Sequence, residues 1–541
     1  MNDNTFKLLV KERVFSRGTK DTPIALRGAN VYRDAPWIFD FRSVIFDPEV
    51  LSYIATRFWD LYASRYPFQV GGMESASIPL ITAVVLEGTR RNMPVHGFYI
   101  RKSRKQDGLM NVFEGGLTDE PVILVDDIIN SGQSIHKQIL LLAEAGRQVT
   151  DIFVLLAYRS LEAYTFAHAR NIRISPLMML TDLDMPLLGS NRRDIPRASF
   201  ETLWRFAAGS PRHSFVVEKS APVLHADALF FGSDDSTMWS LDASSGAVRW
   251  KFKTGRHPKG IFSTPAVTDE TVYFGAYDGS VYALDAKTGS RRWEYACADW
   301  IGSSPALAAD LDLLYVGLEF ALPGTQGGIA ALSIKTGRPV WIDRTREHTH
   351  GSPLYIPSSR TVVIGSNDNT LYAYDASTGE RRWSYVTRGE IKASCAFDSK
   401  RSLIFFGSWD GKLYALNEND GTQAFSFQTD GPIFSTPLID GDMAYIGSLD
   451  KRVYAIDLVS QTLRWVFETS GRVFASPVLA QGSLWIGSND GRLYELDPKD
   501  GTLKNFFQAT ECIVNSIAYD EKRERVILPT TANELYCIKR K

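Results

Sequence analysis

The chain has 541 residues, which is too long for one ordinary hydrophobic core and predicts at least two domains. Lysine plus arginine number 60 and aspartate plus glutamate 62, so the net charge is −2 and no bulk basic field indicates nucleic-acid binding. The four cysteines are far apart, which favours reduced thiols over a disulfide framework or a zinc cluster. Because no export signal and no apolar run of about 18 residues is visible, we expect a cytoplasmic protein without membrane segments.

Strand-like and helix-like segments alternate in the first part of the chain. The segment "FQVGGMESASIPLITAVVLEGTRR", from Phe68, is typical of a strand, a glycine loop and a helix, and "VHGFYI" of a further strand. The segment "PVILVDD", from Pro121, predicts a buried strand, "SIHKQILLLAEAGRQV" an amphipathic helix ending at Gly146, and "DIFVLLAY" the next strand. This alternation predicts an α/β domain with a parallel sheet, in which ligands bind at the carboxyl ends of the strands.

Two adjacent carboxylates, Asp126 and Asp127, stand at such a strand end. Like charges on neighbouring residues repel, so a folded protein needs a reason to keep them there. The small-residue loop that follows is Asn130, Ser131, Gly132, Gln133 and Ser134. Its backbone N–H groups, at the start of a helix, can hold a phosphate while the carboxylates bind the hydroxyls of the attached sugar. The pattern predicts a ribose 5-phosphate site, and the alternative is a strand-to-turn junction with solvated acids.

The apolar strand, acidic pair and small-residue loop resemble the signature of type I phosphoribosyltransferases. Three further segments resemble orotate phosphoribosyltransferases in particular, so that the resemblance covers roughly residues 10–185. "APWIFDFRSVIFDPEVL", from Ala35, is similar to the N-terminal hood, and "FYIRKSRKQDGLMNVFEG", from Phe98, to the Arg-Lys pair and mobile catalytic loop. "AYRS", from Ala157, falls where that family keeps a base-contacting arginine. Taken alone, "RKSRK" favours a solvated basic turn or a nucleic-acid patch, whereas beside the acidic pair it favours the catalytic loop.

The resemblance implies transfer from phosphoribosyl pyrophosphate (PRPP) with Mg²⁺, which would be held through substrate and water and by no direct protein ligand. It assigns the ribose hydroxyls to Asp126 and Asp127, and the 5-phosphate to Asn130, Ser131, Gly132, Gln133 and Ser134. The pyrophosphate would contact Arg101, Lys102 and the loop residue Lys105, and the pyrophosphate loop would be Glu74, Ser75, Ala76 and Ser77. The base would contact Arg159. Cations and Mg²⁺ would stabilise the charge that develops as pyrophosphate leaves.

Two positions depart from the orotate pattern. Ala76 stands where many orotate enzymes carry lysine, and Asp107 stands where they usually carry histidine. A carboxylate facing pyrophosphate would repel it. Either the loop aligns differently or the substrate has changed, so we expect a phosphoribosyltransferase acting on an unidentified base or other acceptor. The alternative is a non-catalytic PRPP or nucleotide sensor in a signalling or defence assembly.

The second part of the chain repeats itself. Compare "GAYDGSVYALDAKTGSRRW" with "GSNDNTLYAYDASTGERRW"; the leading glycines fall at Gly232, Gly275, Gly317, Gly365, Gly407, Gly447 and Gly487. A period of this size in short strands predicts a β-propeller with one sheet per repeat. We expect aromatic residues on the last strand of each repeat to pack between blades: Trp250, Trp293, Trp341, Trp383, Phe425 and Trp465.

The last copy, from Asn515, offers only three strands. A strand-like segment before the first copy, "HSFVVEK" at His213–Lys219, is predicted to supply the fourth strand and so close the ring. That makes eight blades, and seven blades plus a stray hairpin is the alternative count.

The repeats resemble the pyrroloquinoline-quinone-type propeller repeat over roughly residues 214–541, as "YALDAKTGSRRW" and "IFSTP" illustrate. Quinone dehydrogenases of that family are exported and many carry adjacent cysteines, which this chain lacks, so we expect no quinone cofactor. A quinone-dependent dehydrogenase remains a weaker alternative to a platform for a protein partner or ligand. His348 and His350 could share a metal ion, but no cysteine or carboxylate spacing completes a ligand set, which favours turn histidines.

The predicted fold is therefore an α/β phosphoribosyltransferase domain with a parallel sheet, followed by an all-β propeller of eight blades. The predicted boundaries are a hood segment at 1–60, a transferase core at 61–185, a connector at 186–213 and the propeller at 214–541. The expected partners are PRPP, a base or other acceptor, a protein or ligand on the propeller and, by the resemblance, a second copy in a homodimer.

Overall fold

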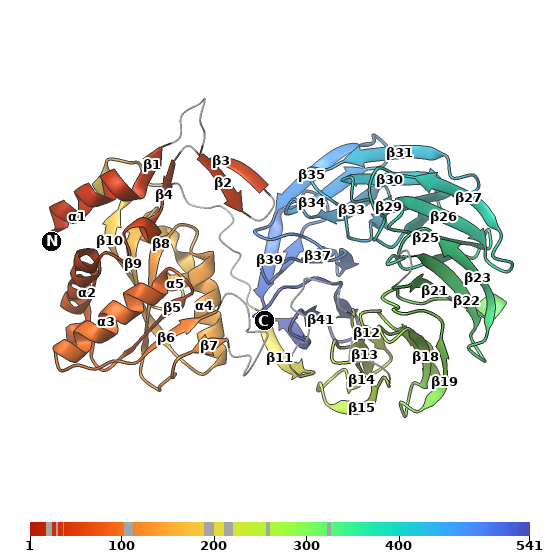
Figure 1. Cartoon of the computed structure of the whole chain (residues 1–541), viewed down its shortest axis with the longest axis horizontal. Helices are drawn as coiled ribbons and strands as arrows, with labels where there is room; N and C mark the ends of the chain where they lie inside the picture. The colour runs from red at the N-terminus through yellow and green to blue at the C-terminus, as the bar shows by residue number, and fades with distance from the viewer. Residues whose placement is uncertain are drawn as a thin grey trace. The chain divides into compact units, whose positions relative to one another are not determined.

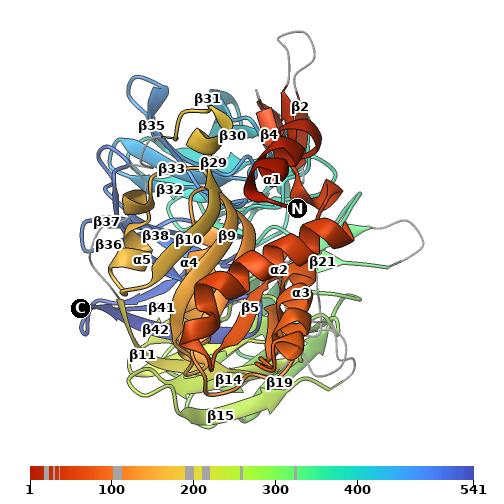
Figure 2. The ribbon, with the colours of Figure 1, turned by 90° about the vertical axis from the view of Figure 1, so that its left-hand side faces the viewer.

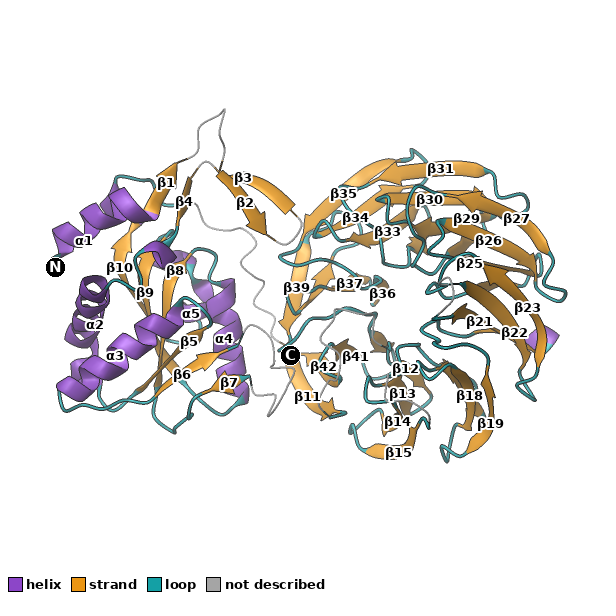
Figure 3. Ribbon diagram, viewed as in Figure 1, coloured by secondary structure: helices purple, strands orange, loops and turns teal. Residues whose placement is uncertain are grey.

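The computed structural model describes residues 1–17, 24–28, 31–35, 37–101, 112–188, 200–209, 220–255, 260–321 and 326–541. They form two compact units, Met1–Asp194 and Ile195–Lys541. Among the described residues the α-helices all lie in the first unit, and the second is built from strands with one short 3-10 helix, Ala309–Leu311 (Figure 3). Among the helices of the described ranges, none is long and apolar enough to cross a membrane.

A six-stranded sheet forms the centre of the first unit (Figure 1). Its strands are β5 (Gln69–Met73), β6 (Gly97–Ile100), β7 (Phe113–Glu114), β8 (Val122–Ile129), β9 (Val149–Ala157) and β10 (Arg173–Met179). They lie in the order β10-β9-β8-β5-β6-β7. Every pair is parallel except β6 with β7. The predicted parallel sheet is confirmed, with one antiparallel strand added at its edge.

Helices cover both faces of this sheet. They are α1 (Asp3–Leu9), α2 (Pro48–Tyr62), α3 (Ser77–Arg90), α4 (Gln133–Glu144) and the short α5 (Thr165–His168). Figure 2 shows α2 and α3 side by side in front of the sheet. Because side chains alternate along a strand, Ile123 and Val125 of β8 join the core under α2 and α3, whereas Val122 and Leu124 join the core under α4.

Two small antiparallel pairs precede α2. They are β1 (Phe15–Arg17) with β4 (Trp37–Phe39), and β2 (Ile24–Gly28) with β3 (Val31–Ala35). The chain then enters α2 through Asp47, whose carboxylate accepts hydrogen bonds from the backbone N–H groups of Glu49 and Val50. Pro48 occupies the first turn, where its missing N–H costs nothing. The local sequence thus fixes where α2 begins.

The second unit consists of eight four-stranded antiparallel sheets, which confirms the eight-bladed count. Blades one to four are β12 (Val223–His225), β13 (Ala228–Gly232), β14 (Thr237–Asp242) and β15 (Val248–Lys253); β16 (Ala266–Val267), β17 (Thr271–Gly275), β18 (Ser280–Asp285) and β19 (Arg291–Ala296); β20 (Ala306–Ala308), β21 (Leu313–Glu319), β22 (Gly327–Ser333) and β23 (Pro339–Thr345); and β24 (Leu354–Ile356), β25 (Thr361–Gly365), β26 (Thr370–Asp375) and β27 (Arg381–Val386).

Blades five to seven continue the same order. They are β28 (Ala396–Asp398), β29 (Leu403–Gly407), β30 (Lys412–Asn417) and β31 (Gln423–Gln428); β32 (Leu438–Asp440), β33 (Met443–Ser448), β34 (Arg452–Asp457) and β35 (Thr462–Glu468); and β36 (Val478–Ala480), β37 (Ser483–Gly487), β38 (Arg492–Leu496) and β39 (Leu503–Gln508). The eighth joins β40 (Ala518–Asp520), β41 (Arg525–Thr530) and β42 (Glu534–Arg540) to β11 (Phe200–Ala207).

The prediction of which segment closes the propeller ring was wrong. His213–Lys219 lies outside the described residues, and the fourth strand of blade eight is β11, which pairs antiparallel with β42 from Phe200↔Arg540 to Ala207↔Glu534. The signal was present in the sequence, because "LWRFAAG" around Trp204 has the pattern of "RWKFKTG" around Trp250. The propeller therefore begins inside the segment predicted as a connector.

In seven of the eight blades an aromatic residue of the fourth strand occupies the position facing the next blade, and six of these residues were predicted; the seventh is Trp204 of β11, and blade seven has Asn505 instead. The indole N–H of Trp250 donates to the backbone carbonyl of Ala286 in the following blade, at 3.0 Å. Its ring covers Gly289, which has φ +71°, and a Cβ added there would lie 2.6 Å from the indole. Equivalent bonds run from Trp204, Trp293, Trp341, Trp383 and Trp465 to the carbonyls of Ala243, Ile334, Ala376, Glu418 and Pro498.

Candidate functional site

The site expected in the first unit lies where the strand order of the sheet reverses. From β5 the chain proceeds outward to β6 on one side, while β8 lies on the other side of β5 and is followed outward by β9. The loops after β5 and β8 therefore leave the same edge of the sheet toward opposite faces, and this is where open α/β sheets form a crevice. Ligands of open α/β sheets bind in such a crevice, at the carboxyl ends of the strands.

The acidic pair lies at the carboxyl end of β8, half-buried. Oδ1 of Asp126 accepts a hydrogen bond from the backbone N–H of Asp127 at 3.0 Å, and Oδ1 of Asp127 accepts one from Ile128 at 2.8 Å. Burial raises the pKa of Asp127 above its ordinary value, while its hydrogen bonds and the positive charge of Arg42 oppose the rise. The pair is thus held in a fixed geometry beside a low-dielectric environment.

Two residues near the pair were missed by the sequence reasoning. They are Arg42 and Tyr158. The pKa of Arg42 is raised mainly by its hydrogen bond to Asp40, with a contribution from the charge of Asp127. Burial raises the pKa of Tyr158, and the charge of Asp127 adds to this rise. The Arg42 guanidinium is largely exposed and is bound by Asp40 at 2.7 Å. Arg42 lies within the segment quoted above for its resemblance to the hood, so its position in the sequence was a usable signal.

The predicted phosphate loop leads directly into α4. Gly132 has φ +74° and caps the helix, and a Cβ added to it would lie 2.4 Å from the ring of Phe166. Only glycine combines this left-handed backbone with so close an aromatic contact. The first N–H groups of a helix have no partner within it, so the amino end of α4 offers donors and a partial positive charge to an anion.

The segment after β9 is hydrogen-bonded to this loop and to the end of β8. The buried guanidinium of Arg159 donates to the backbone carbonyl of Asn130 at 3.0 Å and to its side-chain Oδ1 at 3.2 Å. The Tyr164 hydroxyl donates to the carbonyl of Ile129 at 3.0 Å, and Phe166 stacks on His136. The structure therefore places Arg159 as a support of the phosphate loop, while its predicted contact with a base stays a prediction.

The predicted pyrophosphate loop, Glu74 to Ser77, connects β5 to α3. Its first backbone N–H donates to the carbonyl of Ile100 on β6 at 2.9 Å, and the Ser77 hydroxyl donates back to the carbonyl of Met73. The Ser134 hydroxyl contacts the Met73 sulfur at 3.5 Å, which brings the two predicted loops together. A Cβ at Gly72 would lie 2.4 Å from the Val125 carbonyl, so the strands that carry the loops need glycine here.

The basic residues are described only in part. Arg101, at the end of β6, donates to Glu114 at 3.2 Å, and its backbone N–H donates to Val112. Lys102, Lys105 and Asp107 lie outside the described residues, so their predicted roles stay predictions. The structure thus brings together the acidic pair, the predicted phosphate loop and the predicted pyrophosphate loop, with Arg101 at the end of the neighbouring strand β6.

Comparison with known proteins gives separate matches for the two units. The family model described as outer membrane protein assembly factor BamB matches residues 194–355, 326–401 and 367–506, which together span more than half of the chain. The chain belongs to this family. The propeller also resembles solved structures in fold: BamB from Moraxella catarrhalis (TM-score 0.51, 18% identity, 63% of this chain and 98% of that one) and a europium-containing methanol dehydrogenase (0.54, 13%, 63% and 93%).

The first unit is similar to phosphoribosyltransferases. Orotate phosphoribosyltransferase from Bradyrhizobium sp. (strain BTAi1 / ATCC BAA-1182) is 26% identical over 166 residues, 30% of this chain and 86% of that protein. The enzyme of the same name from Pyrococcus furiosus is 28% identical over 155 residues, covering 28% and 81%. Both resemblances stated from the sequence, to the transferase and to the propeller repeat, are confirmed.

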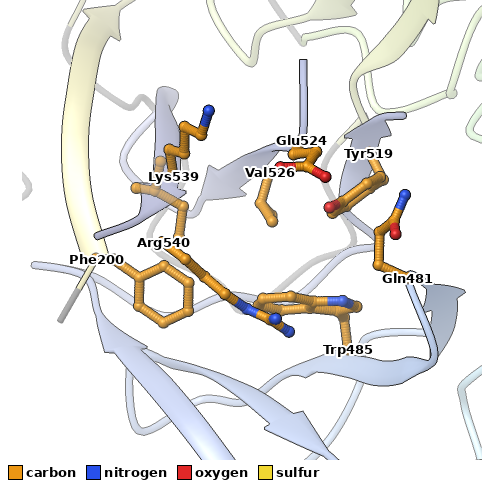
Figure 4. Close-up of a pocket in the computed structure, with 9 residues that line it drawn as sticks. Phe200, Gln481, Trp485, Tyr519, Glu524, Val526, Lys539 and Arg540 are labelled. Atoms are coloured by element: carbon orange, nitrogen blue, oxygen red, sulfur yellow. The ribbon is translucent and has the colours of Figure 1, made fainter. Parts of the chain in front are cut away.

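A hollow lies beside blade eight, in which β42 pairs with β11 from the other end of the unit and no turn joins the two strands. Phe200, Trp485 and Arg540 are among the residues that line it (Figure 4). It has a volume of about 170 Å³. The Arg540 guanidinium lies 5.7 Å from the centroid of the Trp485 ring and is paired with the buried Glu495. Asn505 occupies the position in blade seven that tryptophan has in most others, because the next blade has no turn there for an indole to cover.

Proposed function

We propose that the first unit transfers a phosphoribosyl group from PRPP to a nitrogenous base or another acceptor. The observation that carries this proposal is the meeting of three features at the strand-order reversal: the acidic pair in the carboxyl-terminal half of β8, the small-residue loop at the amino end of α4, and the Glu74–Ser77 loop after β5. The similarity to orotate phosphoribosyltransferases supports the reaction class and leaves the acceptor open.

In this proposal each loop binds one part of the donor. The backbone N–H groups of the Asn130–Ser134 loop bind the 5-phosphate, the carboxylates of Asp126 and Asp127 accept hydrogen bonds from the ribose hydroxyls, and the Glu74–Ser77 loop positions the pyrophosphate. The bond from the anomeric carbon to pyrophosphate oxygen breaks, the leaving group keeps the electron pair, and the acceptor forms the new bond. Mg²⁺, held through the substrate and water, would neutralise charge on the leaving group.

The test is PRPP consumption by the full chain with Mg²⁺, measured as pyrophosphate release against a panel of free bases, nucleotides and cell extract. Changing Asp126→Asn together with Asp127→Asn should reduce release by about two orders of magnitude or more. The matched control is Asp119→Asn with Asp184→Asn, two exposed carboxylates of the same unit with the same charge change. Unchanged turnover in the first double variant would refute the assignment.

A second candidate function is supported by Ala76. This position in the Glu74–Ser77 loop lacks the lysine that many orotate enzymes carry, so the loop contributes less positive charge to the leaving group. A unit of this kind would bind PRPP or a nucleotide as a sensor and pass the signal to the propeller. Calorimetric binding of PRPP without pyrophosphate release, across the whole panel of acceptors, would favour the sensor over the transferase.

We further propose that the propeller recruits a partner or ligand without a quinone cofactor, and that the chain acts in the cytoplasm. No disulfide joins any of its four cysteines in the described ranges, and burial raises the pKa of the Cys395 thiol to about 12. A redox spectrum after reconstitution with quinone tests whether the propeller binds that cofactor, and cell fractionation tests the cytoplasmic location.

The homodimer expected from the resemblance is tested by measuring the mass of the protein in solution.

A further inference from the structure

A carboxylate and two imidazoles converge beside the third blade of the propeller. Glu319 ends strand β21, and His348 and His350 lie in the segment that leads from β23 to blade four. One nitrogen or oxygen atom from each of the three lies within 4.8 Å of those of the other two. Nδ1 of His350 is 3.2 Å from Oε1 of Glu319. The carboxylate that the sequence spacing did not reveal is therefore supplied by the fold.

The carboxylate of Glu319 is buried and fixed. Its side chain is 3% exposed, and Oε1 accepts a hydrogen bond from the backbone N–H of Gly302 at 3.2 Å. The main chain of Glu319 forms an antiparallel bridge with Trp300, with hydrogen bonds of 3.1 and 3.2 Å. A buried carboxylate is costly unless hydrogen bonds or a cation compensate its charge, and here the backbone N–H of Gly302 and the imidazole of His350 both lie 3.2 Å from Oε1.

The two histidines are held by the residues around them. Thr349, between them in sequence, is fully buried, and its hydroxyl accepts a hydrogen bond from the N–H of Gly328 at 3.2 Å. Nε2 of His348 is 3.1 Å from the carbonyl oxygen of Phe320. Because a carbonyl oxygen only accepts, Nε2 carries the proton and the neutral ring keeps its lone pair on Nδ1. Metal-binding histidines are commonly oriented by such a bond from the other ring nitrogen.

We propose that Glu319, His348 and His350 bind a divalent transition-metal ion, with Zn²⁺ as the first choice. Two imidazoles and one carboxylate suit Zn²⁺, Fe²⁺ or Co²⁺ and are a poor match for Mg²⁺ or Ca²⁺, which prefer oxygen ligands alone. Bonds of about 2.0–2.1 Å in a tetrahedral site place neighbouring ligand atoms about 3.3 Å apart. The 3.2 Å between Glu319 and His350 fits this spacing.

The proposed site is open on one side. Three protein ligands leave at least one coordination position for water or for a donor atom of another molecule, as in catalytic zinc sites. The His350 side chain is 31% exposed, so this ligand can be reached from solvent. The ion would therefore give the propeller a point at which a ligand with a nitrogen, oxygen or sulfur donor binds.

The experiment titrates the full chain with Co²⁺, whose visible absorption reports its ligands, and then displaces it with Zn²⁺. Wild type should bind a single tight ion, and Glu319→Gln, His348→Asn and His350→Asn should each weaken the affinity at least about tenfold. His225→Asn is the matched control, because His225 is half-exposed and bonds to the exposed Asp269 outside the site. The double variant of Asp126 and Asp127 should also retain the ion, which separates this site from the acidic pair.

Two results would overturn the proposal: no visible Co²⁺ spectrum with wild type, or equal affinity in all three ligand variants. Circular dichroism checks that each variant folds. If the buried change Glu319→Gln disrupts the blade, the exposed change His350→Asn still decides, because Zn²⁺ should raise the unfolding temperature of wild type and not of that variant. An equal rise in both proteins contradicts the proposal.

Discussion

The two units use the same local device for different purposes. In the propeller, tryptophans of the fourth strands cover glycines of positive φ in the turn between the third and fourth strands of the next blade. Trp250 of blade one, for example, covers Gly289 of blade two. Among the described residues of the first unit, one ring makes this contact: Phe166 covers Gly132, whose φ is +74°. The propeller repeats the contact to hold neighbouring blades together, whereas the first unit uses it once, to shape the loop that we propose binds a phosphate.

This difference predicts how each unit responds to substitution. Loss of one junction leaves the other blades joined by equivalent contacts, so a change in the propeller should lower stability without affecting the first unit. Loss of the single ring contact at Gly132 should affect both stability and binding, because no second copy can replace it. Hydrogen exchange measured by mass spectrometry reports each unit separately and can test both expectations.

The largest expected effect is that of Trp465→Ala. The side chain is 8% exposed, and its indole N–H donates to the carbonyl of Pro498 at 3.0 Å. Removing a buried indole costs about 3–5 kcal/mol, because a cavity remains and the carbonyl loses its partner. Denaturant unfolding should show this loss, with unchanged PRPP affinity. Trp409→Ala, at a 38% exposed position, is the control and should cost less than about 1 kcal/mol.

Gly132→Ala should destabilise the first unit by about 2–4 kcal/mol, from a left-handed backbone and a methyl group forced against Phe166. PRPP binding should be lost with it. The matched control is Gly146→Ala at the other end of α4, where φ is +72° and a Cβ would meet nothing within 4 Å. This control should cost only about 1 kcal/mol and keep binding. Equal effects of the two changes would show that the ring contact has no role.

The fold could be predicted from the sequence wherever a pattern is periodic or local. The glycine repeat and the alternation of strands with helices gave both architectures, since hydrophobic periodicity and turn residues directly reflect secondary structure. The closing strand was placed wrongly because its pairing partner, β42, is distant in the chain, and a weak apolar run at His213 was preferred to the Trp204 motif. Motif comparison with the other copies would have found it.

The candidate sites show the same limit. Asp126, Asp127 and the Gly132 loop could be predicted because they are contiguous in sequence. Arg42, Tyr158 and the support that Arg159 gives to Asn130 depend on contacts between distant elements. Glu319 is separated from His348 by two strands, so no ligand spacing in the sequence could connect them. Chemistry that is assembled by tertiary contacts leaves no short motif to read.

A smaller effect is expected when the indole hydrogen bond alone is removed. Trp250→Phe keeps a ring over Gly289 but leaves the Ala286 carbonyl without the indole donor, which should cost about 1 kcal/mol. Phe425 occupies the same position in blade five, so the fold accommodates this residue at a junction. Trp204→Phe removes the corresponding bond where the ring closes, and a similar cost at both junctions is expected from denaturant unfolding. A cost far larger at Trp204 would contradict the equivalence of the junctions.

The smallest expected effect is the pH dependence of PRPP binding. Burial raises the pKa of Asp127, so this carboxyl takes up a proton at a higher pH than an exposed aspartate does. Protonation removes a charged acceptor for the ribose hydroxyls, so affinity should fall severalfold as the pH falls through this raised pKa. Asp127→Asn should bind PRPP weakly, and its affinity should depend less on pH.

The free energy of unfolding without ligand should change with pH in the opposite direction. Because the pKa of Asp127 is raised in the folded state, its contribution to stability is present at low pH and is lost as pH rises through that pKa. Calorimetric titration and denaturant unfolding across the pH range around this pKa measure the two trends, and parallel trends would contradict the placement of Asp127 in a buried site.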